Sequence, residues 1–332
     1  MKKILIVIAI LSLPFCAGAQ TIIFSSNMGS SASANFDQLK TPDSTIQFGY
    51  DWASDTCPAG YGYTTVPASP GGDTVGLKVT VNNTADPTDY KEGVSIYAKT
   101  APSTSRYDVE FDLWGAYGTT GTTEHAGMVI QASGTKLCII REVDLSTVDP
   151  ATPGYSGGAV IDEDGLAFGF SADYLGDALS DYYCFMPSTR TGTPNTDNSM
   201  AQIGTWTDSD PLPPATGNLH QKRISMTPYS TAYTFPAGRT NTSTAGFYWN
   251  HIKAEVRVDT VSFYINGVKF VDVNSTLTDK KVGIIVTDPY VSVSDDPSYF
   301  LIDNFKITEV PAPTPTPTPI PILNARNWEM FQ

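Results

Sequence analysis

The sequence predicts an all-β fold, an antiparallel β-sandwich, on three grounds. Only 16% of the 332 residues are charged, whereas Gly (27), Pro (24) and Tyr (17) are abundant, which favours strands and turns. Apolar and polar residues alternate from 251 to 258, the period of a half-buried strand. The pair Asn266-Gly267 suits the positive φ angles of a tight hairpin turn. A sheet with one apolar face needs a second layer, so two sheets are expected.

The clearest part of the predicted sheet is a meander of three strands. Its first strand, 249–258, places apolar side chains on one face and a polar row that includes Lys253 and Arg257 on the other. A turn at Asp259-Thr260 leads into the second strand, and the Asn-Gly turn leads into the third. The apolar face of this meander is expected to contribute to the core.

The first hundred residues alternate short strands with loops rich in Gly, Pro and Ser. Between two of these strands, residues 49–72 form a long loop that carries Trp52 and three tyrosines. Such a loop either covers an edge of the core or lines a ligand groove, and covering is the favoured interpretation. The strands expected in this part are 21–24, 45–48, 75–81 and 93–98.

The strand predicted at 106–114 carries a ladder of carboxylates. Asp108, Glu110 and Asp112 alternate with apolar residues and therefore share one face with Trp114. Between 144 and 214 the pattern weakens, which indicates loops attached to the same sandwich. The other strands expected are 124–130, 136–143, 166–171, 182–186, 281–286 and 299–308.

The two ends of the chain predict export and a C-terminal extension. A basic start, an apolar run too short for a membrane span and an A-x-A cleavage site at Ala19 are typical of a signal peptide. We therefore expect a secreted or cell-surface protein with no membrane span in the mature chain. Repeated prolines after the last strand favour an extended linker. The expected organisation is a signal peptide (1–19), a sandwich (20–310), a Pro/Thr-rich linker (311–321) and a short tail (322–332).

The charge and the cysteines limit the partners and the covalent chemistry. A formal charge of −14 repels phosphate backbones and anionic lipid, so nucleic acid is not an expected partner. The excess of carboxylates suits calcium, neutral sugars or solubility outside the cell. After cleavage Cys57, Cys138 and Cys184 remain, and a Cys138–Cys184 disulfide is favoured because both lie in strand-like runs. Three buried thiols are the open alternative.

Three stretches, YDVEFDLW, the meander and the closing residues 282–307, resemble the concanavalin A-like lectin/glucanase jelly rolls. The same three stretches also resemble the laminin G-like domains of secreted bacterial proteins. The resemblance implies a jelly-roll sandwich and an extracellular glycan or cell-surface component as partner. It also implies calcium near the start of the last strand, where Asp303 matches the ligand position. A bulge stabilised by Asp303 and Asn304 is the alternative.

The same resemblance includes family-16 glycoside hydrolases, whose catalytic strand reads E-x-D-x-E. Two imperfect copies are present: Glu142 and Asp144, with Ser146 in place of the second glutamate, and the ladder that contains Glu110 and Asp112. Paired carboxylates on one strand face can serve as nucleophile and acid/base. The alternative is a solvated face with cross-strand ion pairs to the polar row of the meander.

The favoured function is therefore a non-catalytic carbohydrate-binding or surface-display sandwich. Aromatic rings in sugar sites stack on pyranose rings, although core or edge packing is the favoured role for each ring in this chain. A glycoside hydrolase and a structural matrix or surface-layer component, with self-association, are the alternatives. The candidate aromatic ligand-binding residues are Trp52, Trp114, Tyr117 and Trp206.

Overall fold

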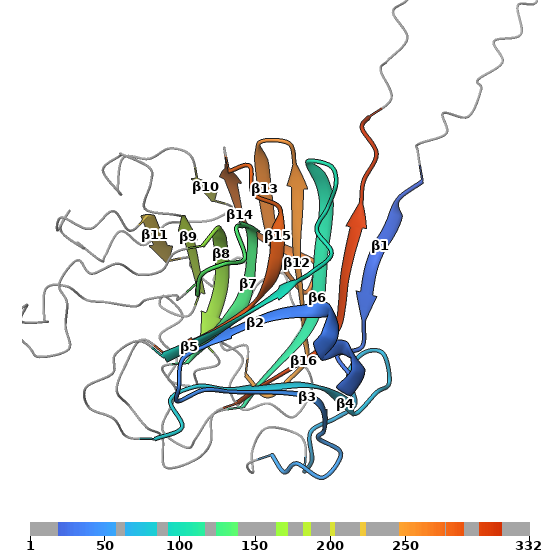
Figure 1. Cartoon of the computed structure of the whole chain (residues 1–332), viewed down its shortest axis with the longest axis vertical. Helices are drawn as coiled ribbons and strands as arrows, with labels where there is room; N and C mark the ends of the chain where they lie inside the picture. Colours follow the sequence, from blue (N-terminus) through green and yellow to red (C-terminus); the bar gives the residue numbers. More distant parts are fainter. Residues whose placement is uncertain are drawn as a thin grey trace, which may run out of the picture.

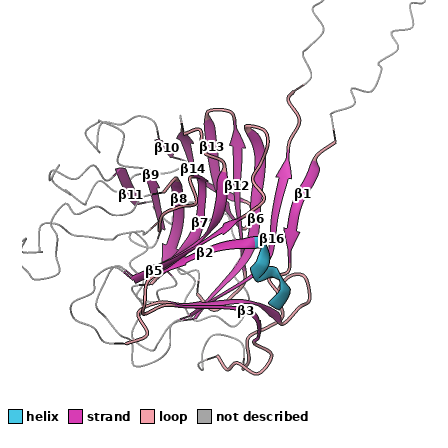
Figure 2. Cartoon of the chain, viewed as in Figure 1, coloured by secondary structure: helices cyan, strands magenta, loops and turns pink. Residues whose placement is uncertain are grey.

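The structure is a computed structural model in which strands dominate (Figure 2). Within the described part of the chain, the one helix is the short 3-10 helix η1 (Ser30–Asn35). No helix in this part is long and apolar enough to cross a membrane. The residues described are 19–57, 64–84, 92–116, 124–138, 164–171, 182–186, 200–202, 220–223, 246–275, 277–288 and 299–313.

One layer of the molecule is a nine-stranded antiparallel sheet (Figure 1). Its order is β10-β14-β13-β12-β6-β16-β4-β3, and β1 pairs with β16 beside this path. The strands are β1 (Thr21–Ser26), β3 (Thr45–Asp51), β4 (Val75–Thr80), β6 (Arg106–Ala116), β10 (Met200–Gln202), β12 (Asn250–Arg257), β13 (Thr260–Ile265), β14 (Val268–Asn274) and β16 (Tyr299–Glu309).

The second layer is a seven-stranded antiparallel sheet in the order β11-β9-β8-β7-β15-β5-β2. Together the two sheets confirm the predicted antiparallel sandwich. The strands of this layer are β2 (Phe36–Lys40), β5 (Glu92–Ala98), β7 (His125–Ala132), β8 (Leu166–Ser171), β9 (Tyr182–Met186), β11 (His220–Arg223) and β15 (Lys281–Asp288).

The core lies between the sheets and follows the alternation of the sequence. In β12, Ile252, Ala254 and Val256 are buried, whereas the polar residues between them are partly exposed. Phe111 of β6 stacks on Phe305 of β16 with a centroid distance of 6.1 Å. The polar residues of β12 and β6 therefore lie on the face turned away from the second sheet, which we call the outer face.

The predicted meander is confirmed, with one turn displaced by a residue. β12, β13 and β14 are consecutive neighbours, and Asn266 and Gly267 have φ angles of 50° and 80°. The first turn is Val258-Asp259, because Arg257 pairs with Thr260. Val258 has a φ of 65°, so it belongs to the turn and not to the strand.

Several predicted boundaries differ from the structure. The prediction of a strand at 136–143 is wrong for 136–138, because this part of the chain forms no ladder and its Cys138 N–H donates to Ser95 Oγ at 2.8 Å. The sequence analysis also missed β2, whose apolar residues are too few to show alternation. Residues 1–18 and 314–332 lie outside the described part, so the signal peptide and tail stay predictions.

Candidate functional site

The candidate site is built around an irregularity in β16. One edge of β16 pairs with β6, whereas the opposite edge pairs first with β4, up to Ile302, and then with β1, from Phe305 onward. The register shifts between Asp303 and Lys306, and Asn304 has a φ of 56°. Asn is among the few residues that adopt this left-handed conformation readily. The bulge turns the Asn304 side chain toward β6 on the outer face.

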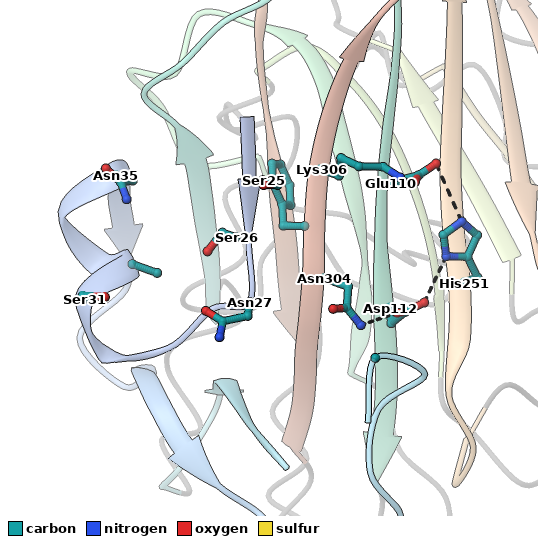
Figure 3. Close-up of a pocket in the computed structure, with 13 residues that line it drawn as sticks. Ser25, Ser26, Asn27, Ser31, Asn35, Glu110, Asp112, His251, Asn304 and Lys306 are labelled. Carbon is teal, nitrogen blue, oxygen red and sulfur yellow. Dashed lines mark hydrogen bonds and ion pairs between the residues drawn. The ribbon is translucent and has the colours of Figure 1, made fainter. Parts of the chain in front are cut away.

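Beside this bulge lies a groove with a volume of about 680 Å³ (Figure 3). Its floor comes from β6, β12 and β16, and its flank comes from the end of β1, from η1 and from the chain around Gly71. Most of the lining side chains are polar. The polar lining residues are Ser25, Ser26, Asn27, Ser31, Asn35, Glu110, Asp112, His251, Asn304 and Lys306.

A hydrogen-bonded network fixes the floor of the groove (Figure 3). His251 lies directly opposite Asp112 in the register of β12 and β6, and its Nδ1 donates to Asp112 Oδ1 at 3.0 Å. Asn304 Nδ2 donates to the other oxygen, Oδ2, at 2.8 Å. Because a carboxylate only accepts, the proton of a neutral imidazole lies on Nδ1, which leaves Nε2 as an acceptor.

A second carboxylate in the groove, Glu110, is paired with a cation. It lies opposite Lys306 in the register of β6 and β16, and the two side chains form an ion pair. His251 Nε2 lies 3.9 Å from Glu110 Oε2. The carboxylates are the more buried groups, since the side chains of Asp112 and Glu110 are 6% and 18% exposed, against 43% for His251 and 36% for Lys306. A ligand in the groove therefore meets the imidazole and the ammonium first.

The rest of the carboxylate ladder forms cross-strand ion pairs outside the groove. Asp108 lies 2.7 Å from Arg257 Nη1 and 3.1 Å from Lys253 Nζ. Burial would raise the pKa of Glu255, but the hydrogen bond and charge of Lys253 and the charge of Arg257 hold this pKa below its usual range. The cross-strand ion pairs of the predicted alternative are thus present, but Asp108 and Asp112 are buried and not solvated. A catalytic role for Glu110 and Asp112 stays a prediction.

The structure places two predicted ligand-binding residues, Trp52 and Trp114, in the core. Both are 0% exposed, so they present no ring to a ligand, and we correct this prediction. Trp114 lies on the outer face with Asp112, but the described residues 52–57 and 64–73 fold over that end of the sheet and cover it. Trp52 Nε1 and Trp249 Nε1 both donate to Pro67 O, at 3.2 and 3.0 Å.

These tryptophans form one aromatic cluster, with Trp249 5.3 Å from Trp52 and 5.9 Å from Trp114 between ring centroids. For the described residues, the prediction that the long aromatic loop covers an edge of the core is confirmed.

Asp303 anchors this covering loop to the sheet. It is 0% exposed, and its carboxylate accepts hydrogen bonds from Ser69 Oγ at 2.6 Å and from the N–H of Asn304 at 2.7 Å. Burial raises the pKa of Asp303, against the effect of these two hydrogen bonds. Gly71 is packed so closely on Asn304 that a Cβ would lie 2.9 Å from Asn304 Oδ1. The loop therefore ends at the rim of the groove.

Calcium takes about six to eight oxygen ligands, and the two Asp303 oxygens accept hydrogen bonds from Ser69 Oγ and from the N–H of Asn304. A calcium ion at Asp303 stays a prediction. Among the described residues, no group of three or more His, Cys, Asp or Glu side chains is arranged to hold a metal ion. The predicted alternative, stabilisation of a bulge, agrees with the hydrogen bond from the Asn304 N–H to Asp303 Oδ1.

Other predicted residues lie where the structure does not test them. Glu142, Asp144, Tyr117 and Trp206 are outside the described residues. Cys138 is 4% exposed, and the Cys184 backbone belongs to β9, but the side chain of Cys184 is not described. The Cys138–Cys184 disulfide therefore stays a prediction.

On the floor of the groove, sequence reasoning assigned no site role to His251, Asn304 or Lys306, and it also missed the polar residues of the flank. His251 had a usable signal, because it belongs to the same polar row as Lys253, and pairing that row against the carboxylate ladder places it near Asp112. Asn304 was predicted only as part of a bulge with Asp303, and Lys306 had no signal, because the bulge changes which face each residue of β16 occupies.

The sequence matches no protein-family model and no curated protein. Among solved structures, it is similar to a Bacillus subtilis protein of unknown function with a galectin-like fold, at 11% identity and a TM-score of 0.40, over 89% of this chain and 99% of that one.

It is also similar to the Ca²⁺/Man3GlcNAc-bound exoplasmic/lumenal domain of VIP36, at 8% identity and a TM-score of 0.42, over 88% of this chain and 90% of that one. A third similar structure is the carbohydrate binding module CBM66 from Bacillus subtilis, at 10% identity and a TM-score of 0.32, over 80% of this chain and 94% of that one.

Proposed function

We propose that this chain is an exported sandwich that binds an extracellular glycan in the groove beside His251. The observation that carries the proposal is the fixed network of donors and acceptors on the groove floor, in which Asn304 and His251 hold Asp112 from both sides. Sugar hydroxyls both donate and accept hydrogen bonds, so they need such mixed groups at close spacing.

The network is already arranged to receive a ligand. Because its side chains hold one another, binding costs little additional ordering. The apolar lining residues Phe305 and Ala32 are themselves buried, so recognition in the described groove relies on hydrogen bonds more than on stacking. Ser25, Asn27 and Asn35 supply neutral hydroxyl and amide groups along the flank.

The experiment is a glycan array probed with the purified mature chain and with His251→Ala. We expect retention on at least one glycan and a loss of affinity of about tenfold or more in the variant, because a central hydrogen-bonding group is removed. Lys269→Ala is the matched control, since Lys269 pairs with Asp272 on β14 and does not line the groove. Absence of retention on any glycan, or equal binding by His251→Ala, would overturn the proposal.

The same samples test glycoside hydrolysis, the alternative from the sequence. Polysaccharides retained on the array are incubated with the protein, and new reducing ends are measured. Release that disappears in Glu110→Gln and in Asp112→Asn would assign a catalytic pair to the groove, whereas retention without release supports binding.

A further inference from the structure

We propose that Glu110 makes the groove selective for neutral glycans over glycans that carry carboxylates. This inference rests on the proposed function, because it concerns the class of sugar that the same groove binds. Its basis is the ion pair between Glu110 and Lys306. Both residues line the groove, so the negative charge that compensates the Lys306 ammonium lies inside the site itself.

Among the described residues, the groups that carry or can carry a charge in the groove are Glu110, Asp112, Lys306 and the imidazole of His251. With a neutral imidazole, two carboxylates outweigh one ammonium. Lys306 is thus the fixed cation available to attract a uronate, and it already has a carboxylate beside it. A uronate that approaches Lys306 also approaches Glu110, so the attraction of one is offset by the repulsion of the other.

Asp112 adds to the repulsion of a uronate. Its carboxylate lies on the groove floor and accepts from the neutral amide of Asn304 and from His251, so no fixed positive charge is paired with it in this network. The net charge of −14 of the whole chain acts in the same direction, but salt screens charges beyond about 8–10 Å. Selectivity is therefore set inside the groove.

A neutral sugar uses both halves of the Glu110–Lys306 pair. One hydroxyl can accept from the ammonium while the same or a neighbouring hydroxyl donates to the carboxylate. A uronate carboxylate can accept from the ammonium but cannot donate to Glu110. Both oxygens of Glu110 thus favour a ligand that carries protons on its polar groups.

The test compares two hexasaccharides that differ at C6, β-1,4-mannohexaose and β-1,4-hexamannuronate, with cellohexaose and hexagalacturonate as a second neutral and a second anionic probe. Affinities are measured by calorimetry for the wild-type chain, Glu110→Gln and Glu255→Gln. Glu255→Gln removes the same charge from the same sheet face, but Glu255 does not line the groove.

For the wild type we expect at least one neutral probe to bind about tenfold tighter than either uronate. Glu110→Gln keeps the side-chain size and frees Lys306, so uronate affinity should rise about fivefold or more, whereas neutral affinity should fall, because an amide oxygen accepts from a sugar hydroxyl less strongly than a carboxylate does. The double variant Glu110→Gln/Lys306→Gln should lose that gain, and Glu255→Gln should bind as the wild type does.

The outcomes separate this inference from the proposed function. Uronates that bind the wild type as tightly as neutral probes, or an equal gain in Glu110→Gln and Glu255→Gln, would refute the inference and leave glycan binding intact. If no probe of either class binds, this inference fails, and the proposed function fails with it only if the glycan array also shows no retention.

Discussion

At the scale of the residue, Asp303 determines where the outer face is covered and where it is open. Its buried carboxylate holds Ser69 and thereby the loop that covers the tryptophan cluster. The adjacent Asn304, turned by a left-handed backbone, belongs to the groove. Two consecutive residues thus form the boundary between the covered part of the outer face and the groove.

We predict that the buried Asp303 carboxyl makes stability depend on pH. Burial raises its pKa above the usual 3.8, so the folded chain holds the proton more tightly than the unfolded chain. The wild type should therefore gain stability relative to Asp303→Asn as the pH falls from 7 toward 4. Asparagine can keep both hydrogen-bonded neighbours while remaining neutral.

The measurement is the melting temperature of both proteins at several pH values in this window. We expect the difference between them to shift by about 2 °C or more in favour of the wild type on acidification. Asp259→Asn, which removes the same charge at an exposed turn, is the control. A difference independent of pH would contradict the assignment.

Val258 stores backbone strain at the first turn of the meander. It is β-branched, 56% exposed and has a φ of 65°, a conformation in which β-branched residues are strained. We predict that Val258→Gly stabilises the fold by about 1 kcal/mol, because glycine adopts this φ without steric cost. Urea unfolding measures the change. Val268→Gly, at a strand position, should destabilise the fold instead.

At the scale of the element, β16 combines two roles because it changes partner along one edge. Its first residues pair with β4 and its last residues pair with β1, and the bulge lies between these segments. Along the other edge it pairs with β6 almost throughout. The bulge therefore supplies polar side chains to the groove without interrupting the sheet.

We predict that Asn304 contributes to the groove and to the backbone through separable properties. Asn304→Gly keeps the left-handed conformation but removes the amide that donates to Asp112, so glycan affinity should fall about fivefold or more with a small loss of stability. Asn304→Ala should lose the same affinity and in addition about 1 kcal/mol of stability, because alanine disfavours this φ.

Glycan titrations and urea unfolding of both variants make the comparison. Equal stability of the two would show that the backbone conformation of residue 304 is not costly to an alanine. Unchanged glycan affinity in both variants would show that the Asn304 amide makes no contribution to binding.

At the scale of the whole molecule, the fold was predictable because burial imposes a period of two on strands such as β12, and that period is visible in the residues themselves. The carboxylate ladder and its cationic partners were predictable for the same reason. The groove was not, because it depends on a change of strand pairing and on a loop that covers Trp114, and neither leaves a periodic signal.

The pairing of β1 with β16 joins the first described strand to the last, and it has a mechanical consequence. Thr21 lies opposite Glu309, so the start of β1 and the end of β16 lie side by side at one end of the sandwich, as Figure 1 shows. A force applied between these two ends separates β1 from β16 one hydrogen-bonded pair at a time, starting at Thr21. It does not load all the pairs of the ladder at once, as a shearing force would. The sandwich should therefore yield at low force if it is stretched between its termini, and Ser25 to Asn27 of the groove flank would be the first part of the binding surface to be displaced.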